Sequence, residues 1–375
     1  MSLTVCLGAC SLDKARASAY LWMFLNWALG LTSQGCRVVW LTTFPDGKAD
    51  EEVTSGLVAL QGVLARYGLL GAVAVCPRSG TGSNVASLDA LDLDAAAEAD
   101  VFLNLAYHQS GVVGRFRRTA FIDIDPGLTQ LWMSRGELHV PAHDVYFSYG
   151  ETVGSTARIP GCQRKWIYTP PPVHLPEWPV VDAPPTAPYT TLSNWWGEWI
   201  SIEGASVDNS KRASILNYID LPTRSQVTLE LALPLTDAEA DVADRRLLQD
   251  RGWRLRSAAE VCRTPETVRT YIQSSRGEYS CMKPGYAMLE TAWTSERTIN
   301  YLASGKPAVI QNTGRSRLLP DDEGLLRFRD VDEAARRLAS IEADYARHSR
   351  AARQLAEEHF AADRVVARVL SRVVA

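Results

Sequence analysis

The sequence predicts an α/β protein built from two doubly wound domains. Short apolar, β-branched runs alternate with stretches of helical periodicity in the first half of the chain, and the same alternation restarts in the second half. A proline-rich stretch, Thr169 to Pro188, separates the two series. Apolar strands separated by helices are typical of parallel sheets that are covered by helices on both faces. A chain of 375 residues is also long enough for two such domains.

The first domain is predicted as parallel strands joined by crossover helices. Strands are expected at residues 3–9, 37–43, 69–76, 100–106, 119–125, 144–150 and 164–170, where runs such as "RVVWLTT" occur. Helices are expected at residues 15–34, 50–67 and 88–98, with a short one after residue 106, and "RSGTGSN" (78–84) is a predicted loop. The apolar stretch "AYLWMFLNWALGL" in the first helix is shorter than a membrane span and contains Asn26, so it indicates a buried helix.

The proline-rich stretch predicts the boundary between the domains. Proline cannot continue a helix or a central strand, so these residues favour an extended connector. We therefore predict a first domain at residues 1–175, a linker at 176–188 and a second domain at 189–345, followed by a C-terminal helix at 346–375.

The second domain repeats the alternation of strands and helices. Strands are expected at residues 189–194, 226–233, 253–258, 277–283, 308–312 and 325–328. Helices are expected near residues 208–219 and at 237–250, 265–275 and 295–304, and residues 331–375 are expected to be almost entirely helical.

Composition and missing motifs exclude several classes of protein. The net charge of -4 provides no basic surface for nucleic acid, and the seven cysteines are scattered without a CxxC pair, which indicates free thiols in a reducing compartment. We expect a cytoplasmic protein with no nucleic-acid partner and no membrane span. The chain has no GxGxxG and no GxSxG, which argues against a dehydrogenase and an α/β-hydrolase.

The segment "SERTINYLASGKPAVIQNTG" (295–314) predicts a helix, a tight turn and a buried strand in close succession. Ser295 is a good N-cap and Glu296 suits the positive end of the helix, whose amides can also bind phosphate. Gly305 permits a left-handed turn, and the strand places Thr313 and Gly314 at its carboxyl end. The pattern alone fits an ordinary α/β connection as well as one wall of a nucleotide site.

This segment resembles the donor-domain helix–turn–strand of GT-B glycosyltransferases. The stretch "YLWMFLNWALGLTSQGCRVVWLTT" is similar to the first helix and second strand of their acceptor domain. The blocks "FIDIDPGLTQLW", "YFSYGE", "LSNWWGEW", "SRGEYSCMKPGY" and "ADYARHSRAARQLAEEHF" resemble further blocks of one bacterial GT-B group and occur in the same order. The resemblance therefore covers most of the chain.

The resemblance implies GT-B architecture, in which two Rossmann-like domains face a cleft. The N-terminal domain would bind the acceptor, the second domain a nucleotide-activated sugar, and the final helix would pack back on the first domain. The sequence departs from the GT-B pattern at two places. Asn300 and Ala292 stand where many retaining members carry a pair of glutamates, and "CSLDKARAS" replaces the glycine-rich loop after the first strand.

Glycosyl transfer from a sugar nucleotide leaves a diphosphate, which needs cations or helix amides beside it. We predict that Lys283, at a strand end, and Arg297, in the first turn of the next helix, serve the diphosphate together with Ser295 and Glu296. Asn194 and Trp195, after the first strand of the second domain, are predicted to line the diphosphate or a sugar face. Thr313 and Gly314 complete the predicted donor-binding residues.

The residues predicted to act on the acceptor follow the ends of strands in the first domain. "FIDIDPG" places Asp123 and Asp125 there, with Asp125 as a helix cap and candidate catalytic carboxylate, and His108 follows another strand as a candidate base. Asp-Pro-Gly is also an ordinary turn, so we interpret the pair as a structural cap with a carboxylate that faces the cleft rather than as metal ligands. We therefore predict no metal, and treat Glu151 as a weaker candidate.

The function predicted is metal-independent transfer of a sugar, as in a hexosyltransferase, from a nucleoside-diphosphate donor to a small-molecule acceptor. No cofactor is expected beyond the nucleotide sugar as co-substrate. The aromatic residues of the first helix favour an apolar or aromatic specialised metabolite as acceptor. Two alternatives remain: a GT-B relative without transfer, such as a sugar-nucleotide epimerase, and a sugar-nucleotide-binding protein without catalysis.

Overall fold

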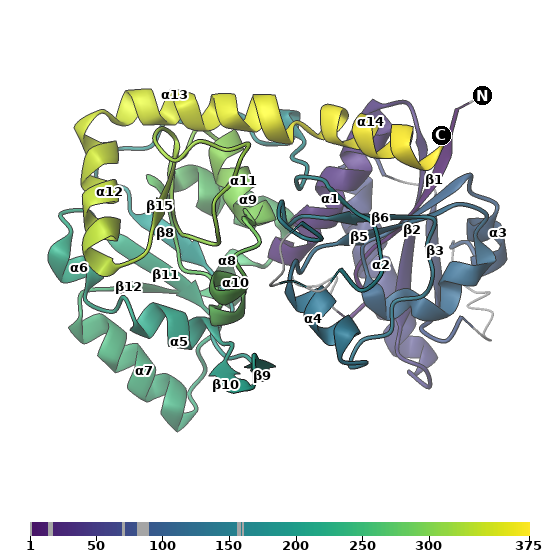
Figure 1. Ribbon diagram of the computed structural model, residues 1–375, viewed down its shortest axis with the longest axis horizontal. Helices are drawn as coiled ribbons and strands as arrows, with labels where there is room; N and C mark the ends of the chain where they lie inside the picture. The colour runs from purple at the N-terminus through teal and green to yellow at the C-terminus, as the bar shows by residue number, and fades with distance from the viewer. Residues whose placement is uncertain (1, 14–17, 70–71, 81–89, 156–158, 160) are drawn as a thin grey trace. The chain divides into compact units, whose positions relative to one another are not determined.

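The structure is a computed structural model that describes residues 2–13, 18–69, 72–80, 90–155, 159 and 161–375, with the backbone but not the side chains of Ser18, His108 and Ser110. The chain divides into two units (Figure 1). The first contains Met1–His174 and Ala361–Ala375, and the second contains Leu175–Phe360. Most of the predicted loop "RSGTGSN" and the start of the helix predicted at 88–98 lie outside the described residues.

The first unit is built on a parallel sheet of seven strands in the order β3-β2-β1-β4-β5-β6-β7. The strands are β1 (Thr4–Gly8), β2 (Arg37–Phe44), β3 (Val73–Pro77), β4 (Val101–Asn104), β5 (Thr119–Asp123), β6 (Val145–Ser148) and β7 (Trp166–Tyr168). The order reverses at β1, which pairs with β2 on one side and β4 on the other. This is the doubly wound topology that the alternating pattern predicted.

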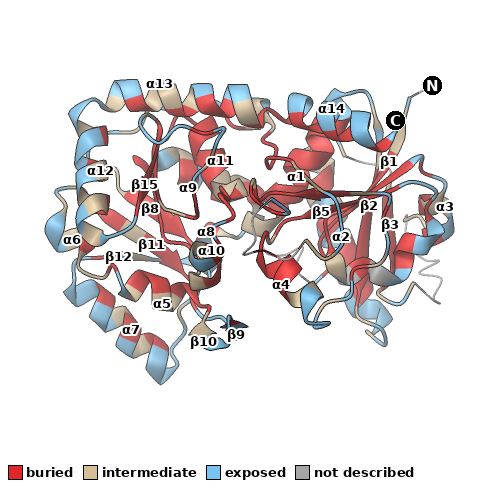
Figure 2. Ribbon diagram, viewed as in Figure 1, coloured by how far each residue is buried: buried red, intermediate tan, exposed pale blue. Residues whose placement is uncertain are grey.

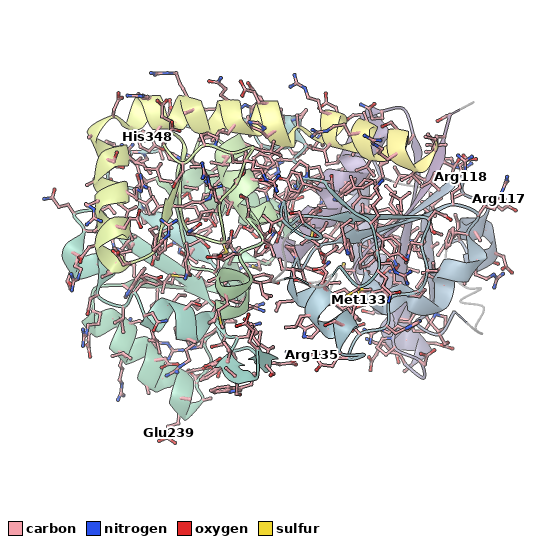
Figure 3. All side chains as sticks on the ribbon, in the orientation of Figure 1. Arg117, Arg118, Met133, Arg135, Glu239 and His348 are labelled. Carbon is pink, nitrogen blue, oxygen red and sulfur yellow. The ribbon has the colours of Figure 1, made fainter. Side chains whose placement is uncertain are left out.

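Helices of the first unit connect and cover these strands. They are α1 (Ser18–Ser33), α2 (Asp50–Arg66), α3 (Leu93–Ala97), the 3-10 helix η1 (Tyr107–Arg115), α4 (Leu128–Ser134) and α14 (Ala362–Val373). The chain's last helix packs on its first: a Cβ at Gly30 would lie 2.8 Å from the Cβ of Ala362. Arg118 (Figure 3) also donates to the carbonyl oxygen of Val374, at 3.0 Å.

Helix α1 is buried, as its composition predicts. Trp22, Phe24 and Trp27 have no exposed surface. The one amide in this apolar stretch, Asn26, is also buried and accepts a hydrogen bond from the backbone of His174 at 3.0 Å. Asn26 is therefore kept inside by a specific partner, which is what a buried polar group requires.

The second unit contains a parallel sheet of six strands in the order β12-β11-β8-β13-β14-β15. The strands are β8 (Tyr189–Leu192), β11 (Leu229–Leu233), β12 (Arg254–Ser257), β13 (Gly277–Ser280), β14 (Ala308–Gln311) and β15 (Leu325–Phe328). Strand β8 is the switch point, with β11 and β13 beside it. The strands of both sheets are mostly buried, and the helices expose their outer faces (Figure 2).

Helices of the second unit follow each strand. They are α5 (Lys211–Leu216), α6 (Leu221–Arg224), α7 (Glu239–Asp250), α8 (Ala258–Val261), α9 (Pro265–Ser274), α10 (Pro284–Leu289), α11 (Glu296–Ala303), α12 (Val331–Ala343), α13 (Tyr345–Leu355) and the π-helical turn Ala356–Phe360. His348 of α13 (Figure 3) accepts a hydrogen bond from the backbone of Gly324 at 3.3 Å. Residues 346–360, which the sequence grouped with the C-terminal helix, lie in the second unit.

A two-stranded antiparallel hairpin was not predicted from the sequence. It consists of β9 (Trp199–Ile202) and β10 (Ala205–Asp208) and is separate from the main sheet. Its turn residues, Glu203 and Gly204, have φ of 51° and 83°. Two successive positive φ angles define the tight hairpin turn, which more often contains Asn-Gly or Asp-Gly.

From Leu175 onward, the proline-rich segment belongs to the second unit and packs on it. Trp178 has no exposed surface, and the ammonium of Lys306 donates to the carbonyl oxygen of Val181. Gly305 has φ of 70°, and a Cβ there would lie 2.9 Å from Val180, so glycine is required at this turn for two reasons. None of the described helices is both long enough and apolar enough to cross a membrane.

Candidate functional site

Polar residues gather where three neighbouring strands of the second sheet end. Strands β8, β13 and β14 lie side by side, and each is followed by a polar segment: Ser193–Asn194, Cys281–Lys283 and Asn312–Gly314. In doubly wound sheets, ligands bind at the carboxyl ends of the strands around the switch point. This edge is therefore the candidate site of the second unit.

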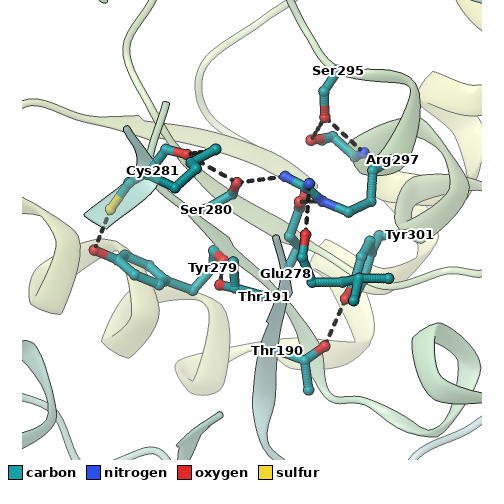
Figure 4. A network of polar contacts seen from close by, with 12 residues as sticks. Thr190, Thr191, Glu278, Tyr279, Ser280, Cys281, Ser295, Arg297 and Tyr301 are labelled. Atoms are coloured by element: carbon teal, nitrogen blue, oxygen red, sulfur yellow. Dashed lines mark hydrogen bonds and ion pairs between the residues drawn. The ribbon is translucent and has the colours of Figure 1, made fainter. Parts of the chain in front are cut away.

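Arg297 joins the three elements beneath this edge (Figure 4). Its guanidinium donates to Glu278 Oε1 at 3.0 Å, to the carbonyl oxygen of Leu192 at 2.7 Å and to Ser280 Oγ at 2.9 Å. The side chain of Glu278 has no exposed surface, and that of Arg297 is 20% exposed. All three guanidinium nitrogens are thus used inside the protein. Arg297 therefore aligns β8, β13 and α11, and its role beside the diphosphate stays a prediction.

The loop after β13 is fixed by its neighbours on several sides. Gln311 accepts from the backbone of Met282 at 2.9 Å, and Asn209 accepts from the backbone of Gly285 at 2.9 Å. Ser214 donates to the carbonyl oxygen of Met282. These bonds hold Lys283 at the N-cap of α10.

Lys283 is an available cation at this edge. Its side chain is half-buried, and its ammonium makes no hydrogen bond or ion pair with any residue that the structure describes. A lysine in a fixed loop at the carboxyl ends of parallel strands is well placed to bind an anion. This placement agrees with the residue's predicted position, while its role remains a prediction.

A second lysine lies behind the same loop. Lys211, the first residue of α5, is 9% exposed and donates to the carbonyl oxygen of Cys281. Burial lowers the pKa of its ammonium to about 7, and the nearby charges of Arg297 and Lys283 act in the same direction. The sequence analysis missed Lys211, although "DNSK" carries an N-cap signal at the start of the helix predicted near 208–219.

The segment that precedes α11 packs tightly against the end of β14. The backbone of Ala292 donates to the carbonyl oxygen of Thr313 at 2.7 Å, and Thr313 Oγ1 donates to the carbonyl oxygen of Trp293 at 2.7 Å. Glu290 and Ala292 have φ of 48° and 54°. Such conformations in residues other than glycine cost free energy and are concentrated at functional sites.

Several buried polar atoms at this edge have no hydrogen-bond partner among the described residues. They are Ser193 Oγ, Glu278 Oε2, Thr291 Oγ1, Trp293 Nε1 and Thr294 Oγ1. Thr291 and Thr294 are 0% and 4% exposed. Because buried polar groups are normally paired, unpaired ones at the same sheet edge as Lys283 favour a site that a polar ligand completes.

Ser295 and Gly314 have local structural tasks. Ser295 Oγ caps α11 by accepting from the backbone of Thr298 at 3.1 Å, as predicted from its N-cap position. Gly314 has φ of 109°, and a Cβ there would lie 2.5 Å from the carbonyl oxygen of Glu290. Glu296 is half-buried in the first turn of the helix.

We expect Gly314→Ala to lower the free energy of unfolding by about 2–4 kcal/mol, because it adds both a clash and an unfavourable φ. Gly204→Ala is the matched control: φ is 83° there, but a Cβ would meet no atom within 4 Å. Gly204→Ala should lower the free energy of unfolding by only about 1 kcal/mol, because the positive φ is its one unfavourable feature. Urea unfolding of both variants checks this, and equal costs would contradict the close packing at Gly314.

Two predicted donor residues differ in what they offer a ligand. Asn194 is exposed just beyond β8, as a binding residue would be. Trp195 has no exposed surface, and its indole N–H donates to Asp244 at 2.9 Å. The prediction that Trp195 lines the donor is therefore wrong, because its position between strand and helix makes it part of the core. The adjacent Trp196 is 52% exposed.

At the corresponding edge of the first unit, Asp123 forms a closed network. It is 1% exposed and accepts from Gln130 at 2.8 Å, Ser148 at 2.7 Å and the backbone of Asp125 at 3.1 Å. Burial raises its pKa to about 6, against the opposing effect of these bonds. Asp123 thus stabilises the turn internally.

The other acceptor-side candidates are only partly resolved by the structure. Asp125 is half-buried, but the N-cap of α4 is Gly127, so the prediction that Asp125 caps this helix is wrong. The turn is held instead by Asp123, two residues earlier, which accepts from the backbone of Asp125, and by Gln130, which accepts from the backbone of Gly127 at 2.7 Å. The side chain of His108 lies outside the described residues, and Glu151 is half-buried after β6. The described residues hold no group of three or more His, Cys, Asp or Glu arranged to bind a metal.

Comparisons with known proteins agree on the fold. No family model matches the chain, and no curated protein matches its sequence. Among solved structures it is similar to an α-glucosyltransferase in complex with UDP and a 13-mer DNA containing an HMU base, with a TM-score of 0.65 and 9% identity over 100% of both chains.

Two further solved structures extend this similarity. A glycosyltransferase from Rickettsia africae ESF-5 has a TM-score of 0.55 and 9% identity over 99% of this chain and 98% of the other. AviGT4, a glycosyltransferase involved in avilamycin A biosynthesis, has a TM-score of 0.53 and 14% identity over 99% and 97%. The chain therefore has the fold of sugar-nucleotide-dependent GT-B glycosyltransferases, with two Rossmann-like sheets, as the resemblance implied.

Proposed function

We propose that this protein is a glycosyltransferase that moves a sugar from a nucleoside-diphosphate donor to a small-molecule acceptor. The observation that carries the proposal is the edge of the second sheet, where Lys283, a cation without a partner among the described residues, lies in a fixed loop at the same edge as buried polar atoms that also lack partners there. A departing diphosphate needs this kind of environment, because positively charged and N–H groups that are fixed in advance stabilise the charge that develops on it.

In the proposed reaction, the diphosphate of the donor lies between Lys283 and the start of α11. The backbone amides in the first turn of α11 and the ammonium of Lys283 offset its charge, and Arg297 keeps α11 aligned with β8 and β13. These groups offer a way to neutralise the leaving group without a metal. The first unit would bind the acceptor, with Asp125 or His108 as candidate base.

The nucleotide and acceptor are proposed from different arguments. UDP is the first nucleotide to test because it is bound in the similar α-glucosyltransferase structures. A specialised metabolite is the favoured acceptor, supported by AviGT4's place in avilamycin A biosynthesis and by the aromatic composition of α1. A DNA acceptor, as in the DNA complex of the α-glucosyltransferase, is disfavoured by the net charge of -4.

A thermal-shift titration with UDP, dTDP, GDP and ADP tests the proposal, each with manganese and with EDTA. A ligand at about a hundred times its dissociation constant adds about 2.7 kcal/mol of stability. Stabilisation by one nucleotide in EDTA supports a metal-independent donor site. The corresponding nucleotide sugar is then incubated with a panel of acceptors, and release of the diphosphate that depends on an acceptor identifies a transferase. Hydrolysis or epimerisation without acceptor would indicate a non-transferring relative. Binding without turnover would indicate a binding protein, and no binding would contradict the proposal.

We expect Lys283→Gln to raise the dissociation constant for the stabilising nucleotide by about 10–100-fold, since a hydrogen bond to a charged group contributes about 1.5–3 kcal/mol. The fold should be unaffected, because Lys283 has no partner among the described residues to lose. Lys165→Gln, which removes an exposed lysine of the first unit, is the control. Equal affinities of the two variants for the nucleotide would exclude Lys283 from the site.

A further inference from the structure

Lys211 is a buried ammonium with a neutral partner. It is 9% exposed, and the contact that its Nζ makes is with the carbonyl oxygen of Cys281. A carbonyl offsets only part of the free energy that an ammonium loses when it leaves water. A nearby carboxylate is the usual compensation for a buried lysine.

The charged groups around Lys211 do not supply that compensation. Arg297 faces it from α11 and Lys283 from the start of α10, and both repel its positive charge. Glu278 of β13 is the nearby carboxylate, but its Oε1 is bonded to Arg297. Cys281, whose pKa is raised by burial to about 11, is a neutral thiol near neutral pH.

The positive charge of Arg212, which follows Lys211 in α5, is compensated by a different carboxylate. Arg212 donates to both carboxylate oxygens of Asp244, at 2.6 and 2.9 Å. The charge of Arg297 is compensated by Glu278, at 3.0 Å, and by the nearby Glu296, whereas neither Lys211 nor Lys283 makes an ion pair with any residue that the structure describes. The ligand-free site favours the neutral form of Lys211, the one of the three whose pKa is lowered by burial to about 7.

We propose that binding of a nucleoside diphosphate at this edge of the second sheet is coupled to uptake of one proton by Lys211. The inference rests on the proposed function, because it needs the diphosphate to lie beside Lys283 and the start of α11. The proton comes from the protonated form of the buffer, whose bond to that proton breaks as an N–H bond forms on Nζ, and the deprotonated buffer is released to solvent. The negative charges of the diphosphate provide the compensation that the protein lacks.

The coupling has a consequence for the site. With Lys211 neutral, the empty site avoids a second unpaired cation close to Lys283, and the loop that carries Lys283 keeps its contact through the carbonyl oxygen of Cys281. When the diphosphate binds, Lys211 becomes charged behind that loop and strengthens the positive potential at the leaving group. The site is therefore most positive when a diphosphate occupies it, and nucleotide affinity should increase as the pH falls towards neutrality.

Isothermal titration calorimetry of the full chain with UDP tests the coupling. The binding enthalpy is measured at about pH 7.5, where a terminal phosphate with a pKa of about 6 is already ionised, in buffers of different ionisation enthalpy. The slope of the binding enthalpy against the ionisation enthalpy of the buffer gives the number of protons exchanged on binding. We expect uptake of about 0.5–0.8 proton per UDP in the unmodified protein, because most Lys211 side chains are then neutral before binding.

Three variants assign the proton to its site. Lys211→Met should bind UDP with a slope near zero, whereas Lys283→Gln should bind more weakly and keep the slope. Lys211→Arg, which carries a permanent charge, should also show no uptake while binding more tightly than Lys211→Met. A slope that persists in Lys211→Met would overturn the inference.

The unmodified protein alone gives a decisive result if a variant does not fold. UDP binding with no dependence on buffer would disprove the coupling and leave the proposed function intact. If neither UDP nor inorganic pyrophosphate binds, the donor site itself is wrong, and the inference is overturned together with the proposed function.

Discussion

Replacing Arg297 with methionine is expected to lower the free energy of unfolding by about 3–5 kcal/mol, the usual cost of leaving a buried charge without its partner. Glu278, whose side chain has no exposed surface, would lose its partner at 3.0 Å, and its second oxygen already has none among the described residues. The carbonyl oxygen of Leu192 and the hydroxyl of Ser280 would lose donors as well. Urea unfolding monitored by circular dichroism measures the change.

A double replacement separates charge from packing at this site. Glu278→Met combined with Arg297→Met should recover much of the lost stability, because two apolar side chains need no partners. Arg336→Met, on the exposed face of α12, is the control and should change stability by less than about 0.5 kcal/mol. If Arg297→Met behaved like the control, the network in Figure 4 would not be what holds β8, β13 and α11 together.

Most strands of both sheets could be predicted because they are buried on both faces, the edge strands β7 and β12 being exceptions. Continuous runs such as "RVVWLTT" and "AVIQN" identify parallel strands without knowledge of their partners, and β2 and β14 lie within a residue of the predicted limits. The hairpin β9–β10 was missed because its strands are partly exposed and its Glu-Gly turn is uncommon. Residues 346–360 were grouped with the last helix because helical periodicity does not reveal which core a helix covers.

The sequence predicted where the candidate site lies, but not what each of its residues does. Strand ends and an N-cap signal located Lys283, Ser295 and Gly314, since carboxyl ends of parallel strands share one edge. The sequence could not tell that the guanidinium of Arg297 points inward to Glu278, or that Trp195 is enclosed, because both depend on contacts between distant residues. Lys211 was missed for the same reason: its burial comes from the loop after β13, about seventy residues later in the chain.

Lys211 is expected to make the free energy of unfolding strongly dependent on pH. Lysine in the unfolded chain has a pKa of 10.5, and burial lowers it in the folded protein to about 7. Below about pH 7 the residue is charged in both states, so the folded state bears the full cost of a buried charge. Between these two pKa values the unfolded state binds more protons, and the free energy of unfolding therefore rises with pH by up to about 1.4 kcal/mol per pH unit.

Lys211→Met removes this contribution, so its stability relative to the unmodified protein should be greatest at low pH and should fall as the pH rises. Between about pH 6.5 and pH 9 we expect the difference between the two proteins to change by about 2–3 kcal/mol, measured by urea unfolding without any ligand. Lys165→Met removes an exposed ammonium that stays hydrated on folding, so the same comparison should be flat. A flat profile for Lys211→Met would mean that Lys211 stays charged in the folded protein. The positive cluster at the edge of the second sheet would then be complete before any diphosphate binds.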